Sequence, residues 1–177
     1  MNLDYTHTES EFVDFDRDKL VFHMLSTEGP RISKGDANGD GREDFYVGGA
    51  KDVAGAMFIQ TSNGSFQERS QKAFIDDKAS EDMQSVFFDS DSDGDQDLYV
   101  CSGSNEFSTS SIALADRLYM NDGNGNFTKS LQILPTFNFE STSVVKPFDY
   151  DKDGDSDLFV GVRSHPFLYG MPMNGYI

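Results

Sequence analysis

One acidic pattern, D-x-[DN]-x-D-G-x-x-D followed by an apolar residue, occurs three times in this chain of 177 residues. The copies are DANGDGRED from Asp36, DSDSDGDQD from Asp89 and DYDKDGDSD from Asp149. Carboxylates at alternate positions repel one another, so such a cluster persists only where something offsets its charge. Three copies with the same internal spacing also indicate a repeat of roughly 50 to 60 residues, which limits the possible folds more than any other feature.

A second element recurs between the acidic copies. MFIQTSNGSF (57–66) and LYMNDGNGNF (118–127) each consist of an apolar run, a polar turn that contains Asn-Gly, and a phenylalanine. Such a turn between apolar runs predicts a β-hairpin. The second repeat is longer because of extra residues within 102–115, which we interpret as a solvent-exposed loop, with a ligand-contact loop as the alternative.

Each repeat therefore predicts four short strands, which are rich in Tyr, Phe, Val and Ile. No segment has convincing helical periodicity. The predicted strands are 31–33, 44–50, 56–60 and 65–71 in the first repeat, 84–88, 97–101, 116–120 and 126–133 in the second, and 143–148 and 157–162 in the third, where Tyr176 begins a third strand.

Four-stranded units at this period are typical of propeller blades. We therefore expect an all-β fold, a partial β-propeller of about two and a half four-stranded blades with calcium-binding loops. The expected divisions are an N-terminal segment at 1–30, a first blade repeat at 31–82, a second at 83–142 and an incomplete third at 143–177.

The acidic loops have the spacing of a calcium site. Oxygens at positions 1, 3 and 5 can converge on one hard cation, and the glycine at position 6 permits the sharp turn. Position 7 then offers its backbone carbonyl, and position 9 a further carboxylate. An EF-hand is excluded, because position 12 is valine in all three loops where that motif requires glutamate. Solvated acidic turns without metal are the alternative. The predicted ligands of up to three Ca²⁺ ions are Asp36, Asn38, Asp40, Arg42, Asp44, Asp89, Asp91, Asp93, Asp95, Asp97, Asp149, Asp151, Asp153, Asp155 and Asp157.

Charge and composition exclude several classes of partner. The formal net charge is −17, with 14 basic and 31 acidic residues, so the surface repels nucleic acid and anionic membranes. No apolar run approaches the 18 or so residues of a membrane span. The one cysteine, Cys101, follows an apolar run and is predicted to be a small core residue.

The acidic loops, the run DFYVGGA (44–50) and the run LYMNDGNGNF (118–127) resemble FG-GAP/VCBS repeats, the calcium-loop blades of integrin alpha-chain-like propellers. The stretch LSTEGPRISKGDANGDGREDFYVGGA (25–50) is also similar to bacterial relatives of cartilage acidic protein, of the ASPIC/UnbV type. The resemblance covers about residues 5–177. It implies a secreted, periplasmic or surface-attached propeller, although no export signal is visible at the N-terminus.

The expected function is a non-catalytic module that presents its surface to a carbohydrate or protein ligand. The alternative is a fragment of a calcium-dependent propeller enzyme, such as a polysaccharide lyase, which needs a base near a sugar acid. No recognisable catalytic arrangement supports that alternative, and the run RSHP (163–166) is its best polar cluster. Its candidate residues are Tyr5, His7, His23, Arg163 and His165.

The loops are predicted to differ in affinity. The loop at 36–44 has Asn38 at position 3, hence three carboxylates where the others have four, and Arg42 adds an opposing charge. Fewer ligand charges weaken calcium binding. Calorimetric titration of variants that each retain one intact loop should therefore show 36–44 as the weakest site. A tighter constant there than in both other loops would refute the charge argument.

Overall fold

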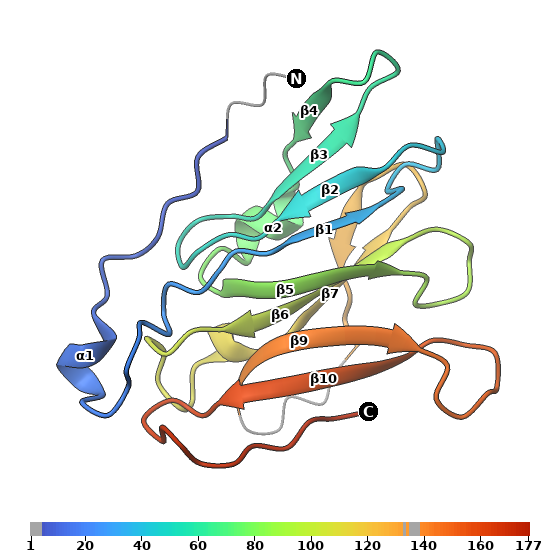
Figure 1. The fold of residues 1–177 in the computed structure, drawn as a ribbon. Helices are drawn as coiled ribbons and strands as arrows, with labels where there is room; N and C mark the ends of the chain where they lie inside the picture. The colour runs from blue at the N-terminus through green and yellow to red at the C-terminus, as the bar shows by residue number, and fades with distance from the viewer. Residues whose placement is uncertain (1–4, 133, 135–138) are drawn as a thin grey trace.

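The computed structural model describes residues 5–132, 134 and 139–177, and it is mostly β (Figure 1). Within these residues the strands form antiparallel sheets in the chain order β1-β2-β3-β4, β5-β6-β7-β8 and β9-β10. All ten predicted strands are present, although Ile133, the last residue of the strand expected at 126–133, lies outside the described residues. Their bounds are β1 (Ile32–Gly35), β2 (Asp44–Val47), β3 (Ala56–Gln60), β4 (Phe66–Arg69), β5 (Glu81–Phe88), β6 (Asp97–Gly103), β7 (Arg117–Asn121), β8 (Phe127–Lys129), β9 (Ser141–Phe148) and β10 (Asp157–Ser164).

The third repeat continues the same pattern up to its end. Position 12 of each acidic loop is a valine that pairs with the first residue of the next strand, as in Val47 with Ala56 and Val100 with Arg117. In the third repeat Val160 forms an antiparallel bridge with Tyr176, with N–O distances of 2.8 and 2.9 Å in the two directions. Tyr176 therefore stands where a third strand begins, as predicted.

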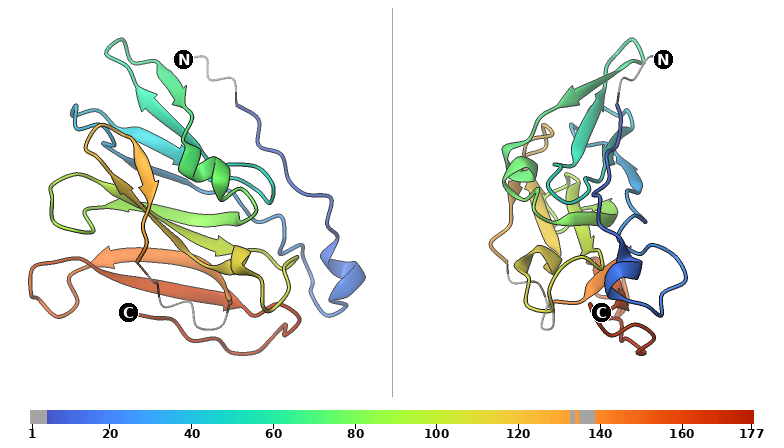
Figure 2. Two further views of the ribbon diagram at one scale, coloured as in Figure 1. Left: turned by 180° about the vertical axis from the view of Figure 1, so that it is seen from behind. Right: turned by 90° about the vertical axis from the view of Figure 1, so that its left-hand side faces the viewer.

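The sheets lie side by side through their first strands, because β1 contacts β5 and β5 contacts β9. Each of these strands is followed by an acidic loop, so all three loops project from the same side of the molecule (Figures 1 and 2). The N-terminal segment runs along the opposite ends of the sheets, with α1 (Asp14–Arg17) near its middle. The fold therefore has two chemically different ends.

The core follows from the two-residue period of the strands. In β6, Leu98 and Val100 face a cluster shared with the first sheet, whereas Tyr99 and Cys101 face a cluster shared with β9 and β10. Successive side chains of a strand point to opposite faces, so a strand between two sheets must be apolar on both. Cys101 is fully buried, which confirms its predicted place in the core.

Three short helical turns were not predicted from the sequence: α1, α2 (Lys72–Asp76) and η1 (Ile112–Leu114). Each spans about one turn, which is too short to show a helical period. None of the helices in the described residues has the length and apolar character needed to cross a bilayer. The extra loop at 102–115 is not simply solvent-exposed, because Phe107, Ala113 and Leu114 form a small buried cluster within it.

A buried ion pair lies between the first two sheets. The guanidinium of Arg117 on β7 contacts the Asp82 carboxylate on β5 at 2.5 Å, and both side chains are almost fully buried. The same carboxylate accepts hydrogen bonds from the Tyr46 hydroxyl at 2.6 Å and from the Gly49 N–H at 2.9 Å. Asp82 is therefore shared between its own sheet and the first one.

Breaking this pair should be costly, because it leaves a buried charge without a partner. We expect Arg117→Met to destabilise the protein by about 3–5 kcal/mol in urea unfolding. The matched control is Lys72→Met, which removes an exposed ion pair with Asp76 and should change the stability by less than about 0.5 kcal/mol. Equal effects of the two substitutions would contradict the role assigned to Asp82.

Candidate metal sites

The three acidic segments are the connections between the first and second strands of each sheet. Loop 1 (36–44) joins β1 to β2, loop 2 (89–97) joins β5 to β6, and loop 3 (149–157) joins β9 to β10. Each loop is anchored at both ends by paired strands, with Gly35 opposite Asp44 and Phe88 opposite Asp97. The strands thus hold the ends of each loop while its middle curls.

The curl depends on left-handed backbone at two positions. The glycine at position 6 has a φ of +81°, +95° and +100° in loops 1, 2 and 3, as its predicted role requires. Position 4 is also left-handed, and it is Gly39 in loop 1 but Ser92 and Lys152 in the others, with φ of +63° and +66°. Left-handed backbone at a non-glycine residue costs about 1–2 kcal/mol. Sequence reasoning missed position 4, because serine and lysine do not signal that conformation.

Backbone N–H groups turn the loop carboxylates inward. In loop 2 the N–H of Asp93 donates to Asp91 Oδ1 at 3.3 Å, and the N–H of Asp95 donates to Asp93 Oδ1 at 3.1 Å. The N–H of Gly94 donates to Asp89 Oδ2 at 3.1 Å. Loops 1 and 3 repeat the bonds from positions 5 and 7. The side chains at positions 1, 3 and 5 therefore share one concave side of the loop.

The three carboxylates at these positions converge in loops 2 and 3, whereas loop 1 has only two, because its position 3 is Asn38. One oxygen from each lies within 4.8 Å of the others in the groups Asp89, Asp91, Asp93 and Asp149, Asp151, Asp153. In loop 1 the Asp40 carboxylate is instead engaged by an ion pair with Arg42 and by the Asn38 amide, whose Nδ2 lies 2.9 Å from it. Two groups on this loop thus occupy the carboxylate that a cation would use.

Loop 2 lacks a partner for its charge among the described residues. Asp89 Oδ1 is shielded from solvent and accepts no hydrogen bond. The pKa of Asp95 is raised to about 6, first by desolvation and then by the charges of Asp93, Asp97 and the other loop carboxylates. In loop 3 the neighbouring Asp153 raises the pKa of Asp155. Crowded carboxylate oxygens with an orphaned acceptor are a donor set that fits a hard divalent cation.

Position 9 has a clear structural role. Asp97 is 1% exposed, and its two oxygens accept the N–H of Ser90 at 3.1 Å and the N–H of Asn121 on β7 at 2.8 Å. In the same way, the two oxygens of Asp44 accept the N–H of Ala37 at 3.0 Å and the N–H of Gln60 on β3 at 2.7 Å. This aspartate therefore joins the start of the loop to the third strand. Its role as a metal ligand stays a prediction.

Position 7 was expected to use only its backbone carbonyl, and no position 7 carboxylate belongs to either convergent group. The Arg42 guanidinium donates from Nε to the Gln60 carbonyl at 3.1 Å. The Asp95 carboxylate lies against the β7–β8 turn, where a Cβ at Gly123 would come within 3.3 Å of its Oδ2. The Asp95 carboxylate therefore faces the β7–β8 turn. The sequence had predicted that it would point outward.

Loops 1 and 2 brace each other. The N–H of Asp36 donates to Gln96 Oε1 at 2.8 Å, and Asn121 Nδ2 donates to the Ala37 carbonyl at 2.8 Å. Sequence reasoning missed both residues, because nothing in one sequence pairs positions so far apart. A groove of about 470 Å³ lies between the two loops. Its lining residues are Asp36, Gly39, Asp93, Gly94, Asp95, Gln96 and Gly123.

The candidate residues of the enzyme alternative are only partly brought together. Arg163 and His23 both contact Glu28, with His23 Nε2 2.6 Å from Glu28 Oε1, so the guanidinium is already paired. His7 contacts Glu9 at 2.7 Å, and His165 Nδ1 lies 3.0 Å from the Pro166 carbonyl oxygen. The remaining candidate, Tyr5, packs edge-on against Phe58.

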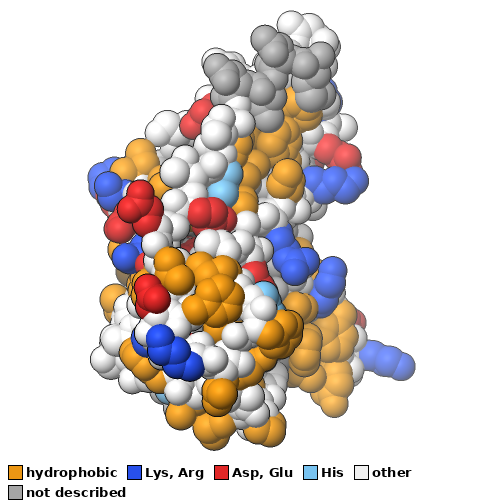
Figure 3. Space-filling model, turned by 60° about the vertical axis from the view of Figure 1, so that its left-hand side comes forward, with side chains coloured by type: hydrophobic (Ala, Val, Ile, Leu, Met, Phe, Trp, Pro, Cys, Tyr) orange, Lys and Arg blue, Asp and Glu red, His pale blue; other side chains and the backbone are white. Residues whose placement is uncertain are grey.

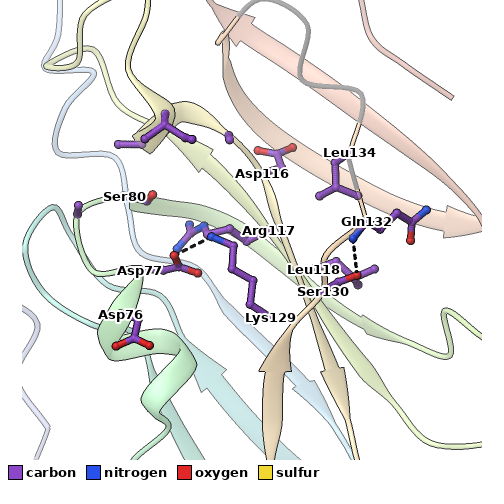
Figure 4. Close-up of a pocket in the computed structure, with 14 residues that line it drawn as sticks. Asp76, Asp77, Ser80, Asp116, Arg117, Leu118, Lys129, Ser130, Gln132 and Leu134 are labelled. Atoms are coloured by element: carbon purple, nitrogen blue, oxygen red, sulfur yellow. Dashed lines mark hydrogen bonds and ion pairs between the residues drawn. The ribbon is translucent and has the colours of Figure 1, made fainter.

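A second pocket, of about 470 Å³, lies away from the acidic loops, among β7, β8, the extra loop and the connection before β5 (Figure 4). The extra loop contributes Ile112 and Ala113 to its wall, and the connection before β5 contributes Asp77. Asp77 and Lys129 form an ion pair at 2.7 Å in its floor. The pocket thus combines charged groups with an apolar wall supplied by the extra loop.

The comparisons with known proteins agree with this architecture. A family model described as an FG-GAP-like repeat matches residues 36–100 and again 89–160, which is most of the chain. Each match begins at the first aspartate of an acidic loop and ends at the position 12 valine of the next. A search of curated proteins found none that matches. The matched segments contain the acidic loops and the strands that position them, and the chain therefore belongs to the family of FG-GAP-like repeat proteins.

Proposed function

We propose that this chain is a calcium-binding module in which each acidic loop can hold one Ca²⁺ ion and the sheets are blades of a β-propeller. The observation that carries the proposal is loop 2, where three inward-turned carboxylates meet within 4.8 Å and one oxygen of Asp89 has no partner. Loop 3 repeats the convergence. Family membership adds support, because it places the loops at the boundaries of the repeat.

Calcium suits these loops better than other divalent ions. The side chains at positions 1, 3 and 5 offer oxygen donors, and Ca²⁺ accepts six to eight oxygens in flexible geometry. Mg²⁺ demands near-octahedral geometry and retains its water, whereas late transition metals favour nitrogen or sulfur ligands. In loop 2 the side chains of Asp89, Asp91 and Asp93 and the Asp95 carbonyl would hold the ion, with Asp97 closing the loop.

The bound ion would act mainly on stability and rigidity. It would offset the desolvation and the repulsion that raise the pKa of Asp95, and it would fix the ends of the first two strands of each sheet. Three ions would change the formal charge from −17 to −11. Extracellular calcium modules bind Ca²⁺ with dissociation constants of about 10⁻⁴–10⁻³ M, and we propose that this module is one of them. Its location would then be outside the cytoplasm, at a cell surface or in a secreted or periplasmic setting.

The propeller interpretation is supported by the way the sheets repeat. Each begins with a strand, an acidic loop and a second strand, and the first strands lie next to one another. Successive blades arranged in this way make a rigid scaffold whose connections carry the binding function.

The pocket in Figure 4 is our candidate ligand site. Asp77, Lys129 and Ser130 offer hydrogen-bonding groups beside the apolar Leu118, a combination suited to a carbohydrate or to a polar protein segment. The enzyme alternative has less support, since Arg163 is paired with Glu28. Retention on glycan or protein arrays without turnover would support a binding module. Release of unsaturated product from a uronate polymer would support the lyase.

Chelation should lower the melting temperature, and the effect should depend on pH. The pKa of Asp95 is raised from 3.8 to about 6 in the metal-free fold, so that fold loses stability as the pH rises through about 6. Calcium would offset both the desolvation and the repulsion that raise this pKa, hence its stabilising effect should be larger at pH 7 than at pH 5. Melting curves with chelator, Ca²⁺ or Mg²⁺ at matched ionic strength measure this. Superimposable curves in chelator and Ca²⁺ at pH 7 would refute calcium binding.

Two aspartates of loop 2 should behave differently despite their similar sequence context. Asp93 belongs to the convergent group and Asp95 does not. We expect Asp93→Ala to abolish binding at this loop, whereas Asp95→Ala should retain the ion and relieve repulsion in its absence. Calcium stoichiometry by equilibrium dialysis separates them, with the wild type as reference. Equal loss of calcium in both variants would mean that the assigned positions are wrong.

A further inference from the structure

Glu81 is a buried carboxyl with no evident compensation. It is the first residue of β5, and it pairs with Gly103 at the end of the sheet opposite the acidic loops. Its side chain belongs to a residue only 1% exposed, and both carboxylate oxygens are shielded from solvent without a hydrogen-bond partner. Burying an unpaired carboxylate is costly, and such a group in a folded protein calls for a bound proton, water or ion.

The groups around Glu81 are mostly acidic. Its pKa is raised to about 9, mainly by desolvation and also by the charges of Glu106 and Glu9. The nearby Ser104 hydroxyl lowers that pKa and the adjacent Glu106 carboxyl raises it, although neither meets the geometry of a hydrogen bond to Glu81. Glu9 also has a shielded oxygen, Oε2, without a partner. Carboxylates from three separate segments thus lie near one another, and the Ser10 hydroxyl joins two of these segments by donating to Glu106 Oε1 at 3.1 Å.

The nearby basic side chains in the described part of the chain form no ion pair with Glu81. Lys51 Nζ lies 3.2 Å from Glu106 Oε2, and His7 Nε2 lies 2.7 Å from Glu9 Oε1. Each of these basic side chains therefore contacts one of the other two carboxylates. Figure 3 shows this side of the molecule, where acidic, basic and histidine side chains lie close together along the N-terminal segment.

The same segments are already joined by a neighbouring polar contact. Asn105 Nδ2 donates to Asp14 Oδ1 at 2.8 Å and to Asp18 Oδ2 at 2.6 Å, so the N-terminal segment is held against the loop that follows β6. Asp14 is fully buried, and its other oxygen accepts the N–H and hydroxyl of Ser26. The backbone that carries Glu9 and Glu106 is thus held near Glu81.

We propose that Glu81, Glu106 and Glu9 form a second type of cation site, for Ca²⁺, that joins the N-terminal segment to the second sheet. Carboxylate oxygens with a serine hydroxyl are donors for a hard cation. Because neither oxygen of Glu81 reaches solvent, the site suits an ion rather than an organic cation. These carboxylates are less tightly gathered than those of loops 2 and 3, so the ion draws Glu9 inward and tightens the segment.

The test removes the charge of the Glu81 side chain while keeping the shape of that side chain. In equilibrium dialysis of the full chain, Glu81→Gln should bind one calcium ion fewer than the wild type. Calcium should also slow tryptic cleavage after Arg17 and Lys19 in the wild type and not in this variant. The control is Glu11→Gln, an exposed glutamate on the same segment, which should match the wild type in both assays.

A second variant tests the proposal in case Glu81→Gln does not fold. Glu9 lies on the outer segment, so Glu9→Gln should spare the sheets and lose the same ion. The proposal is overturned if Glu81→Gln keeps the wild-type stoichiometry and melts higher without calcium, which would identify a proton as the occupant. This test does not depend on the acidic loops. If the loops bound no calcium, the wild type would still bind one ion more than Glu81→Gln.

Discussion

The hydrogen bonds of the position 9 aspartate are the interaction on which the first two repeats depend. Asp44 and Asp97 are buried, and each accepts one N–H from its own loop and one from the third strand of its sheet. Desolvation raises the pKa of Asp44, and the N–H donors only partly oppose this, while Asp40 and Asp36 add to the rise. A cation beside this carboxylate would stabilise its charged form, so the metal binding that we propose would be coupled to strand pairing through one side chain.

Position 11 of the loops links each sheet to the next. In loop 1 it is Tyr46, whose hydroxyl reaches Asp82 on β5. In loop 2 it is Tyr99, whose hydroxyl donates to Asp116 at 2.8 Å, and this carboxylate also accepts the Thr142 hydroxyl of β9 at 2.5 Å. The third loop has Phe159 there, which lacks a hydroxyl. The two-residue period of the strands directs apolar side chains to alternate faces. The same period therefore also positions the polar contacts between sheets.

The two ends of the sheets have different chemistry. At one end the acidic loops lie at the surface, where the carboxylates at positions 3 and 5 of loops 2 and 3 are exposed. At the other end Glu81 is sealed beneath the N-terminal segment and the extra loop. Burial at the second end makes an uncompensated charge far more costly than at the first, because solvent cannot screen it. Cations at the two ends would thus act on different parts of the fold.

The sequence alone determined the strands, the repeat, the acidic loops and the glycine turn at position 6, because these are local and follow from periods of two residues and from spacing within nine. Tertiary structure decided the rest. The left-handed backbone at Ser92, the brace between Asp36 and Gln96, and the burial of Glu81 have no local signal. They arise where sheet packing brings together residues far apart in the chain, and desolvation, which depends on every neighbour at once, then sets the charge state of each group.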